Sequence, residues 1–225
     1  MRKFFLTIFF AAIVSAGFAQ ASYHKNYLVL KGAAAFATGT FASTNANNKG
    51  NGFAETGTHS AIEYNHFLGK NWGFGLTASK RNNNFDALKF AEELVKDAPE
   101  LRVTVFANPY KTNFFLFSGI FQIQASEKFS LYSKLSLGAA TSTLPYLAIA
   151  YYKGPERSDY AREEKKKVAL AGGLGTGLRY NLGKVDLGFE VSALNTSPTF
   201  KFTGKEITPD MNTINAGLTL SYGFM

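Results

Sequence analysis

Apolar and polar residues alternate with a period of two along most of the chain, and each alternating segment ends at a break. This alternation is typical of a β-strand whose two faces meet different environments. Each segment offers roughly the nine to eleven residues that a tilted strand needs to cross a bilayer. The predicted strands are residues 27–40, 57–67, 72–80, 112–124, 129–141, 167–180, 184–194 and 212–224.

The connections between these strands alternate strictly between short and long. The tight turns fall at residues 68–72, 125–129 and 180–184. The long, polar connections are residues 41–56, 81–111, 142–166 and 195–211. All the long loops therefore leave the strands on one side, and the first and last strands have their free ends on the other side.

The two faces of the strands differ in size. In the strand 167–180, Val168, Leu170 and Leu174 share one face, whereas the other face carries mainly alanine and glycine. A soluble barrel fills its interior with large apolar side chains, which a glycine-rich face cannot supply. An eight-stranded barrel has room inside only for side chains. We therefore expect the small face to point inward and the apolar face to meet lipid.

The predicted fold is thus all-β: an eight-stranded antiparallel up-and-down transmembrane β-barrel with short periplasmic turns and long extracellular loops. One strand departs from the pattern, because Phe114, Leu116 and Ile120 make the inward face of residues 112–124 apolar as well. Either the barrel holds some apolar filling there, or the register of this strand differs from the alternation.

The N-terminus has the features of a secretory signal peptide. Arg2 and Lys3 precede an apolar stretch, residues 4–18, which is short for a membrane span and is followed by Ala19-Gln20-Ala21. We expect residues 1–21 to be the signal peptide, cleaved after Ala19 or Ala21, and residues 22–225 to form a single barrel domain. Loss of the two basic residues would change the formal charge from +8 to +6. The absence of cysteine excludes disulfides and a lipid-modified N-terminal cysteine.

Aromatic residues gather at one predicted level, beside the short turns and the chain ends. Amphipathic rings favour the membrane–water boundary and form girdles there. The predicted girdle consists of Tyr27, Trp72, Phe129, Tyr180 and Tyr222.

Six charged residues fall on the inward face, three of them acidic and three basic. They are Lys31, Glu63, Lys134, Arg179, Asp186 and Glu190. Because an unpaired charge in a narrow interior is costly, we expect compensating pairs. They could form a gated ion path or a hydrogen-bonded plug that fills the barrel. The plug is the favoured interpretation, since eight strands leave no continuous aqueous pore.

Residues suited to hydrolysis or metal binding do not come together in this pattern. His59 and Ser60 are neighbours on one strand, so their side chains point to opposite faces. Asp186 and Glu190 stand roughly 13 Å apart along their strand, which is too far for a pair of carboxylates in glycoside hydrolysis. We expect no enzymatic activity, no cofactor and no metal site.

The long loops contain two further predicted elements. The second long loop contains a predicted helix that Pro99 ends, with Phe85, Leu88, Ala91 and Val95 on one face. This helix is expected to rest on the barrel rim or on the lipid surface. The third long loop continues the strand pattern on both sides of a turn at residues 154–155. It predicts a hairpin that projects beyond the membrane, with a break at Pro145 and an exposed edge open to a partner strand.

A basic cluster follows this hairpin, where lipopolysaccharide phosphates would lie. The candidate lipopolysaccharide contacts are Arg162, Lys165, Lys166 and Lys167. Glu163 and Glu164 are interleaved with them, so a plain solvated surface is the favoured alternative.

The chain resembles small outer-membrane β-barrel proteins of the OmpX/OmpW type in all of these features. The resemblance is clearest in one strand–turn–strand stretch, IEYNHFLGKNWGFGLTASK (62–80). This group is also described as the outer membrane protein β-barrel domain or porin-like family of Gram-negative bacteria. The resemblance implies export to the outer membrane and contact with its lipid and lipopolysaccharide. It also implies insertion by the barrel assembly machinery, which reads a C-terminal aromatic with alternate apolar residues before it. The matching residues are Leu218, Leu220, Tyr222 and Phe224, although Met225 leaves the aromatic one place short of the end.

The function that the resemblance implies is broad. The leading hypothesis is a monomeric, non-enzymatic barrel whose long loops serve surface interaction or a structural role in the envelope, with an unknown surface ligand and no nucleic-acid partner. The alternative is OmpW-like passage of small apolar molecules, and a lipid-modifying barrel enzyme is the least favoured hypothesis.

Overall fold

The computed structural model describes residues 24–45, 50–98, 100–202 and 205–224. The predicted signal peptide, residues 1–21, lies outside this part of the chain, as do Pro99 and Met225.

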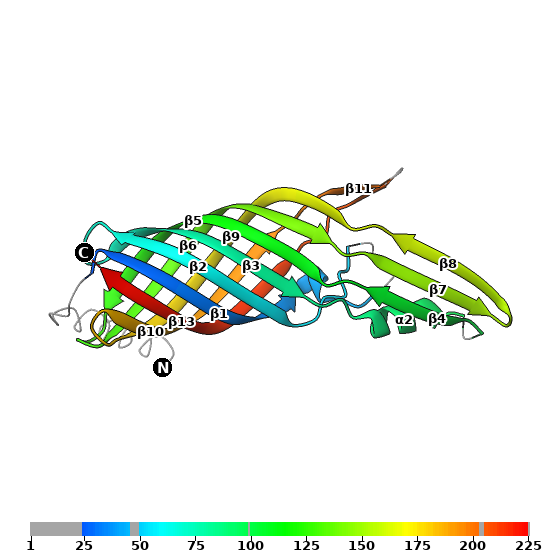
Figure 1. The fold of residues 1–225 in the computed structure, drawn as a ribbon, viewed down its shortest axis with the longest axis horizontal. Coiled ribbons are helices and arrows are strands. Elements are labelled where there is room, and N and C mark those ends of the chain that lie inside the picture. The colour runs from blue at the N-terminus through cyan, green and yellow to red at the C-terminus, as the bar shows by residue number, and fades with distance from the viewer. Residues whose placement is uncertain (1–23, 46–49, 99, 203–204, 225) are drawn as a thin grey trace, which may run out of the picture.

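Eight antiparallel strands form a closed barrel (Figure 1). Each strand is hydrogen-bonded to the barrel strands before and after it in sequence, which confirms the predicted up-and-down barrel. The strands are β1 (Asn26–Thr38), β2 (Gly57–Phe67), β3 (Trp72–Asn83), β5 (Tyr110–Gln124), β6 (Phe129–Leu144), β9 (Lys165–Asn181), β10 (Val185–Thr196) and β13 (Asn212–Phe224).

The first and last strands close the barrel by pairing with each other. The register runs from Asn26 opposite Phe224 to Thr38 opposite Asn212, so β13 is paired to its final described residue. An unpaired strand edge cannot be left in lipid, because its N–H and C=O groups would have no partners there. This requirement accounts for a strand pattern that continues to the C-terminal end of the sequence.

The outward side chains are apolar and the inward ones are packed. Trp72, Leu170 and Leu218 are 65%, 87% and 71% exposed, as expected of side chains that face lipid. Phe114 and Ile120 point inward and are buried, and Leu116 lies buried beside Phe114. The strand β5 therefore keeps its register, and the apolar residues on its inner face are filling.

A second sheet of three strands stands beyond the barrel. It consists of β4 (Arg102–Ala107), β7 (Leu147–Lys153) and β8 (Glu156–Arg162), in the order β4-β7-β8. These strands prolong β5, β6 and β9 past the rim (Figure 1). The predicted hairpin is β7–β8, which turns at Gly154 with a φ of 60°. The sequence pattern did not predict β4, which pairs with β7 and covers one of its edges.

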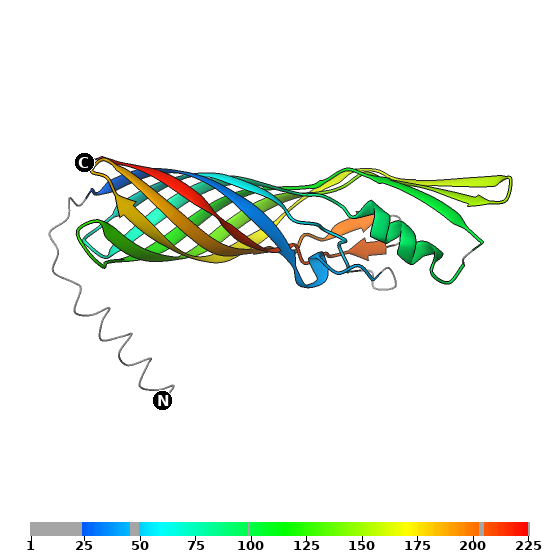
Figure 2. The same ribbon diagram turned by 90° about the horizontal axis from the view of Figure 1, so that it is seen from below.

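The predicted rim helix is α2 (Ala87–Val95). Asp86 caps it, because its Oδ1 accepts a hydrogen bond of 3.0 Å from the backbone N–H of Lys89. The helix lies beside β4, on the side of the sheet toward the barrel axis (Figure 2). No helix in the described residues has the length and hydropathy that a membrane span requires.

The extracellular mouth of the barrel is closed by an apolar cap. The short 3-10 helix η1 (Gly39–Phe41) and the hairpin β11 (Phe200–Phe202) and β12 (Lys205–Ile207) contribute to this end of the molecule. The buried residues of the cap come from the barrel rim and from the first and last long loops. They are Phe41, Ala54, Tyr110, Leu144, Phe200 and Met211.

The close packing of the β1–β13 seam leads to a prediction about stability. A Cβ added at Gly217 would overlap the backbone of Gly32 and Ala33, whereas a Cβ added at Gly32 would meet nothing within 4 Å. Gly217→Ala should therefore lower the free energy of unfolding by about 1–3 kcal/mol through overpacking. Gly32→Ala, at the same seam, should leave it unchanged or slightly higher. Urea unfolding in detergent, followed by the gel shift between unboiled and boiled samples, measures both. Equal stabilities of the two variants would contradict the close packing of this seam.

Candidate functional site: the filled interior and the projecting sheet

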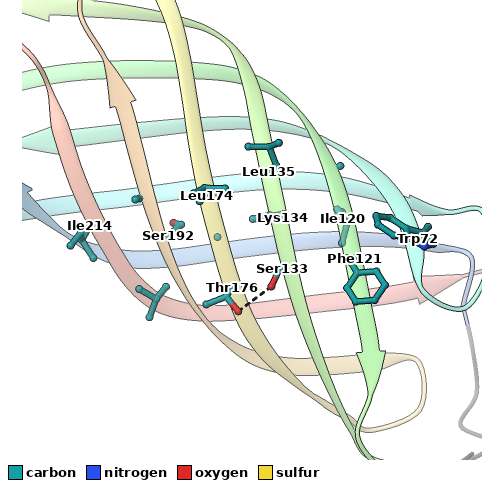
Figure 3. A pocket seen from close by; sticks show the side chains of 14 residues that line it. Trp72, Ile120, Phe121, Ser133, Lys134, Leu135, Leu174, Thr176, Ser192 and Ile214 are labelled. Atoms are coloured by element: carbon teal, nitrogen blue, oxygen red, sulfur yellow. Dashed lines mark hydrogen bonds between the residues drawn. The ribbon is translucent and has the colours of Figure 1, made fainter. Parts of the chain in front are cut away.

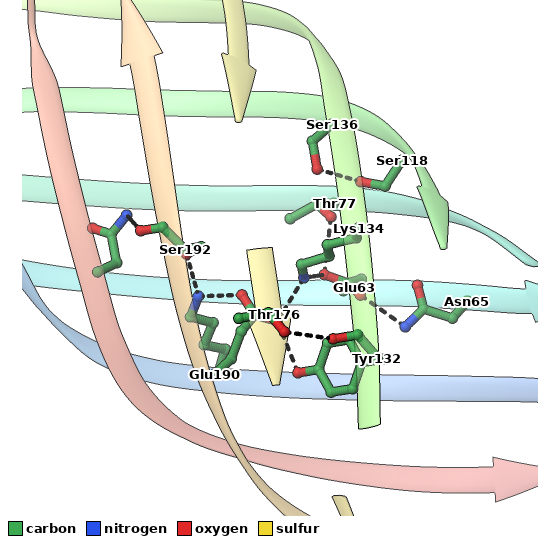
Figure 4. A network of polar contacts seen from close by, with 12 residues as sticks. Glu63, Asn65, Thr77, Ser118, Tyr132, Lys134, Ser136, Thr176, Glu190 and Ser192 are labelled. Atoms are coloured by element: carbon green, nitrogen blue, oxygen red, sulfur yellow. Dashed lines mark hydrogen bonds and ion pairs between the residues drawn. The ribbon is translucent and has the colours of Figure 1, made fainter. Parts of the chain in front are cut away.

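The centre of the barrel holds a cluster of four charges, of which Figure 4 labels Glu63, Lys134 and Glu190. The Lys134 ammonium lies 2.6 Å from the Glu63 carboxylate and 2.8 Å from that of Glu190. Lys31 pairs with Glu190 at 2.5 Å. All four side chains are buried, and they come from β1, β2, β6 and β10. Two acids and two bases therefore neutralise one another across the interior.

The other two predicted interior charges are buried outside this cluster. Arg179 donates a hydrogen bond of 3.2 Å to Gln122, and its guanidinium lies 4.3 Å from the ring centroid of Tyr132. Asp186 accepts a hydrogen bond of 2.8 Å from Asn181. Among the described residues these two charges form no direct ion pair with each other. The expected compensating pairs are thus found for four of the six charges, which form one network, whereas Arg179 and Asp186 are held by neutral groups.

Three interior residues were missing from the predicted site. Tyr132 donates a hydrogen bond of 2.9 Å to Glu190. His59 is 4% exposed and lines the space beside the cluster. Arg81 is 1% exposed and donates to Thr213 at 2.8 Å and to the Met211 carbonyl at 3.2 Å. The alternation of each strand indicates that all three side chains point inward. Arg81, for example, lies two positions after the inward Ser79 on β3.

Side chains fill the interior in layers along its axis. Tyr27, Phe67 and Ile120 pack near the short turns, and the charge cluster follows. Beyond it lie Phe114 and Leu116, which belong to a further apolar layer beneath the cap. The cavity beside the cluster measures about 20 Å³, which admits roughly one water molecule. The layered packing matches the predicted plug.

A larger hollow of about 670 Å³ lies on the outer wall (Figure 3). Exposed apolar residues such as Trp72, Leu135 and Leu174 line it, so it belongs to the lipid-facing surface. Two hydroxyl groups lie within it: Ser133 donates to Thr176 at 3.5 Å, and Thr176 donates to the Tyr132 carbonyl at 3.0 Å. These bonds satisfy polar groups that lipid could not.

The predicted aromatic girdle requires one correction. Trp72, Phe129 and Tyr222 are exposed on the outer wall, and Tyr180 packs against Phe129 with ring centroids 4.9 Å apart. Tyr27 is 4% exposed and points into the barrel, where its ring packs edge-on against that of Phe67. Tyr27 follows the inward phase of β1. It is therefore interior filling and does not belong to the girdle.

The predicted basic cluster is divided in the structure. Arg162 donates a hydrogen bond of 3.5 Å to the Pro145 carbonyl, and burial lowers the pKa of its guanidinium. Lys165 donates to the Lys201 carbonyl at 2.7 Å and lies 4.2 Å from the ring centroid of Phe202. Lys166 and Lys167 remain exposed. The four residues thus do not form one surface patch.

The C-terminal residues predicted as an assembly signal lie on one face of β13. Leu218, Leu220, Tyr222 and Phe224 alternate outward and are exposed on the barrel wall. Their role in assembly stays a prediction.

The projecting sheet has two unlike faces. Leu147 and Ile149 of β7 are buried on one face, and the opposite face carries a groove of about 350 Å³. Ala148 and Ala150 line this groove, with Phe106 and Tyr146 at one end, where their ring centroids are 6.4 Å apart. At the tip, Arg157 pairs with Asp159 at 2.9 Å.

The chain is similar to solved structures of outer-membrane barrels at low sequence identity. The Neisserial surface protein A (NspA) is 13% identical with a TM-score of 0.50, and the match covers 89% of this chain and 97% of that one. A major outer membrane protein from Thermus thermophilus is 10% identical with a TM-score of 0.47, covering 89% and 100%. Ail, the attachment invasion locus protein of Yersinia pestis, is 13% identical with a TM-score of 0.42, covering 89% and 99%. No protein family and no curated protein matches the sequence.

The closed barrel, its apolar outer wall and its filled interior define a class of protein. The chain has the fold of the small outer-membrane β-barrels of eight strands, and this fold supports a place in the outer membrane.

The second prediction concerns the contribution of the charge cluster to stability. Lys134→Met leaves the Glu63 carboxylate buried without its ammonium partner, so the free energy of unfolding should fall by about 3–5 kcal/mol. The double variant Lys134→Met/Glu63→Gln removes one charge of each sign and should recover most of that loss. Denaturant unfolding of the barrel in detergent measures both variants. A double variant as unstable as Lys134→Met would show that packing by Lys134, and not its charge, holds the interior together.

Proposed function

We propose that this protein is a non-enzymatic surface-binding barrel whose recognition element is the three-stranded sheet β4-β7-β8. The barrel serves as a rigid membrane anchor, and the sheet holds the free edge of β8 away from the membrane for an extended segment of a partner protein. The observation that carries this proposal is the sheet itself: an ordered edge strand that projects from a barrel whose interior is filled.

The edge strand is suited to pairing with another chain. β8 pairs with β7 from Leu147 opposite Arg162 to Lys153 opposite Glu156, and no other described strand pairs with it. The residues of β8 before Arg162 are all exposed. An edge strand offers one row of unpaired N–H and C=O groups, and a partner strand that adds to it gains main-chain hydrogen bonds.

The charges on β8 would restrict the choice of partner. Its side chains include Glu156, Arg157 and Asp159, and charged edges discourage indiscriminate pairing. A partner strand would need charges of opposite sign at the facing positions, since like charges placed directly opposite are destabilising. The edge therefore favours a polar, extended polypeptide over an apolar one.

The alternative function, passage of small apolar molecules, gains no support from the interior. Phe114, Leu116 and Ile120, which could have lined an apolar route, are packed side chains. The apolar cap above and the charge cluster below further fill the axis. A catalytic role gains no support either, because the two nitrogens of the buried His59 contact no hydroxyl or carboxylate partner among the described residues.

A truncated hairpin tests the proposed function. Leu147 and Arg162 are cross-strand partners, so residues 148–161 can be replaced by an Asn-Gly turn without changing the barrel strands. Ten-residue peptides selected from a displayed library on the full barrel in nanodiscs should bind the truncated barrel at least about tenfold more weakly, a loss of about 1.4 kcal/mol. Amide exchange in β8 should slow when such a peptide is bound.

A matched control shortens the other surface hairpin, with a tight turn replacing residues 202–205 between β11 and β12. This variant should bind the selected peptides as the full barrel does. Peptides that bind the truncated barrel as tightly as the full barrel, with β8 exchange unchanged, would contradict recognition by this sheet.

A further inference from the structure

The free edge of β8 has a charge pattern that is complementary to itself. Arg157 and Asp159 lie on one face of the strand, where they form an ion pair of 2.9 Å with both side chains more than half exposed. Glu156 and Tyr160 lie on the other face, at equal distances before and after Ser158. A base thus precedes Ser158 by one position, and an acid follows it by one position.

Two copies of β8 that pair antiparallel are related by a two-fold axis, so the same surface serves both copies. Residues directly opposite each other must turn their N–H and C=O groups the same way. One residue of the strand must therefore face its own counterpart. When that residue is Ser158, Arg157 of each copy faces Asp159 of the other copy. Glu156 of each copy then faces Tyr160 of the other, and no like charges are opposed.

The neighbouring registers lack this complementarity. A shift by one residue in one direction places Arg157 opposite its own counterpart, and the opposite shift does the same for Asp159. Like charges placed directly opposite are destabilising. A register centred on Tyr160 forms no charge pair within the strand. The charges therefore favour the register centred on Ser158, in which residues 156–160 of the two copies are paired.

The direction of β8 places the two barrels at opposite ends of this contact. β8 runs from the turn at Gly154 back toward the rim, and the sheet continues the long axis of the barrel (Figures 1 and 2). An antiparallel copy of β8 runs the other way, so its barrel lies beyond the tip of the first sheet. Two barrels arranged in this way lie in two membranes whose outer surfaces face each other.

The length of the sheet limits the distance between these membranes. Val168 is the last apolar outward residue of β9 on the side of the rim, and Ser158 lies ten positions before it in the chain. Ten residues span at most about 35 Å. Two copies that meet at Ser158 therefore hold their lipid-facing walls at most about 70 Å apart.

From this pattern we propose that β8 pairs with β8 of a second copy in a facing membrane. The two sheets then form one continuous sheet in the order β4-β7-β8-β8-β7-β4. The inference rests on the proposed function of the β8 edge, and it names the partner as the same protein. A single contact of this size is weak. Many such contacts between two membranes act together, and their avidity holds the membranes in place.

The first experiment uses liposomes that carry the full barrel. These liposomes should aggregate with one another and not with empty liposomes, as measured by turbidity. Cryo-electron tomography of the aggregates should show apposed membranes with a gap of at most about 70 Å.

Charge-swap variants of β8 provide the decisive comparison. Arg157→Asp and Asp159→Arg each make both facing pairs like-charged, so liposomes of either variant should aggregate at least about tenfold more slowly among themselves. Liposomes of the first variant should aggregate with those of the second, because acids then face bases at every pair. The double variant Arg157→Asp/Asp159→Arg should aggregate as the wild type does. The unboiled gel band shows that each variant is folded.

A single cysteine tests the register, since the sequence contains no cysteine. Ser158→Cys should form a disulfide between two copies under mild oxidation, because the residue faces its own counterpart. Tyr160→Cys is the matched control. Its counterpart lies four positions further along the paired strand, roughly 13 Å away, so no disulfide should form.

The outcomes separate this inference from the proposed function. Self-aggregation of both single variants at the wild-type rate would overturn the self-pairing, and so would a mixed pair and a double variant that both fail to aggregate. Aggregation with empty liposomes would overturn it in favour of lipid contact. If wild-type liposomes stay dispersed while the selected peptides still bind at β8, this inference fails and the proposed function stands. Loss of both activities would overturn both proposals.

Discussion

Everything in this structure depends on the need to satisfy backbone hydrogen bonds in lipid. A strand edge within the bilayer would expose groups that only another strand can satisfy, so the sheet must close on itself. Closure explains the full pairing of β1 with β13, the even number of barrel strands and the strict alternation of short and long connections. It also fixes the interior, because a barrel of eight strands encloses a space that only side chains can fill.

The interior meets this constraint with charge as well as with apolar packing. Lys134 bridges two carboxylates from opposite parts of the wall, and Arg81 joins β3 to the backbone of Met211 beneath the cap. Each buried charge has close polar or aromatic partners, as burial requires. These contacts cross the barrel and hold walls together that share no backbone hydrogen bonds. The interior of the barrel is thus filled, and the proposed binding surface lies on the parts outside the membrane.

The sequence alone predicted the barrel, because the period-two alternation of apolar and polar residues is a local signal. It was insufficient wherever a contact depended on distant residues. Strand β4 was not predicted, and its pairing with β7 joins residues that are 40 to 50 positions apart in the chain. The lysines at 165–167 look alike in sequence, yet Lys165 turns to a carbonyl of the last long loop while Lys166 faces outward. Tyr27 and Arg81, by contrast, follow the alternation, and the phase of their strands would have placed them inside.

The continuity between the sheet and the barrel has a mechanical consequence. The order β4-β7-β8 repeats the order β5-β6-β9, and each strand of the sheet leads directly into its counterpart in the wall. A pull on the tip of the sheet is therefore directed along the barrel strands. Such a pull loads the hydrogen bonds between these strands together, in shear. A peeling force would instead break them one at a time. The two longest strands of the wall, β6 and β9, lie side by side in this path. Tension applied to the sheet is thus carried into the membrane-embedded wall through three short connections, residues 108–109, 145–146 and 163–164.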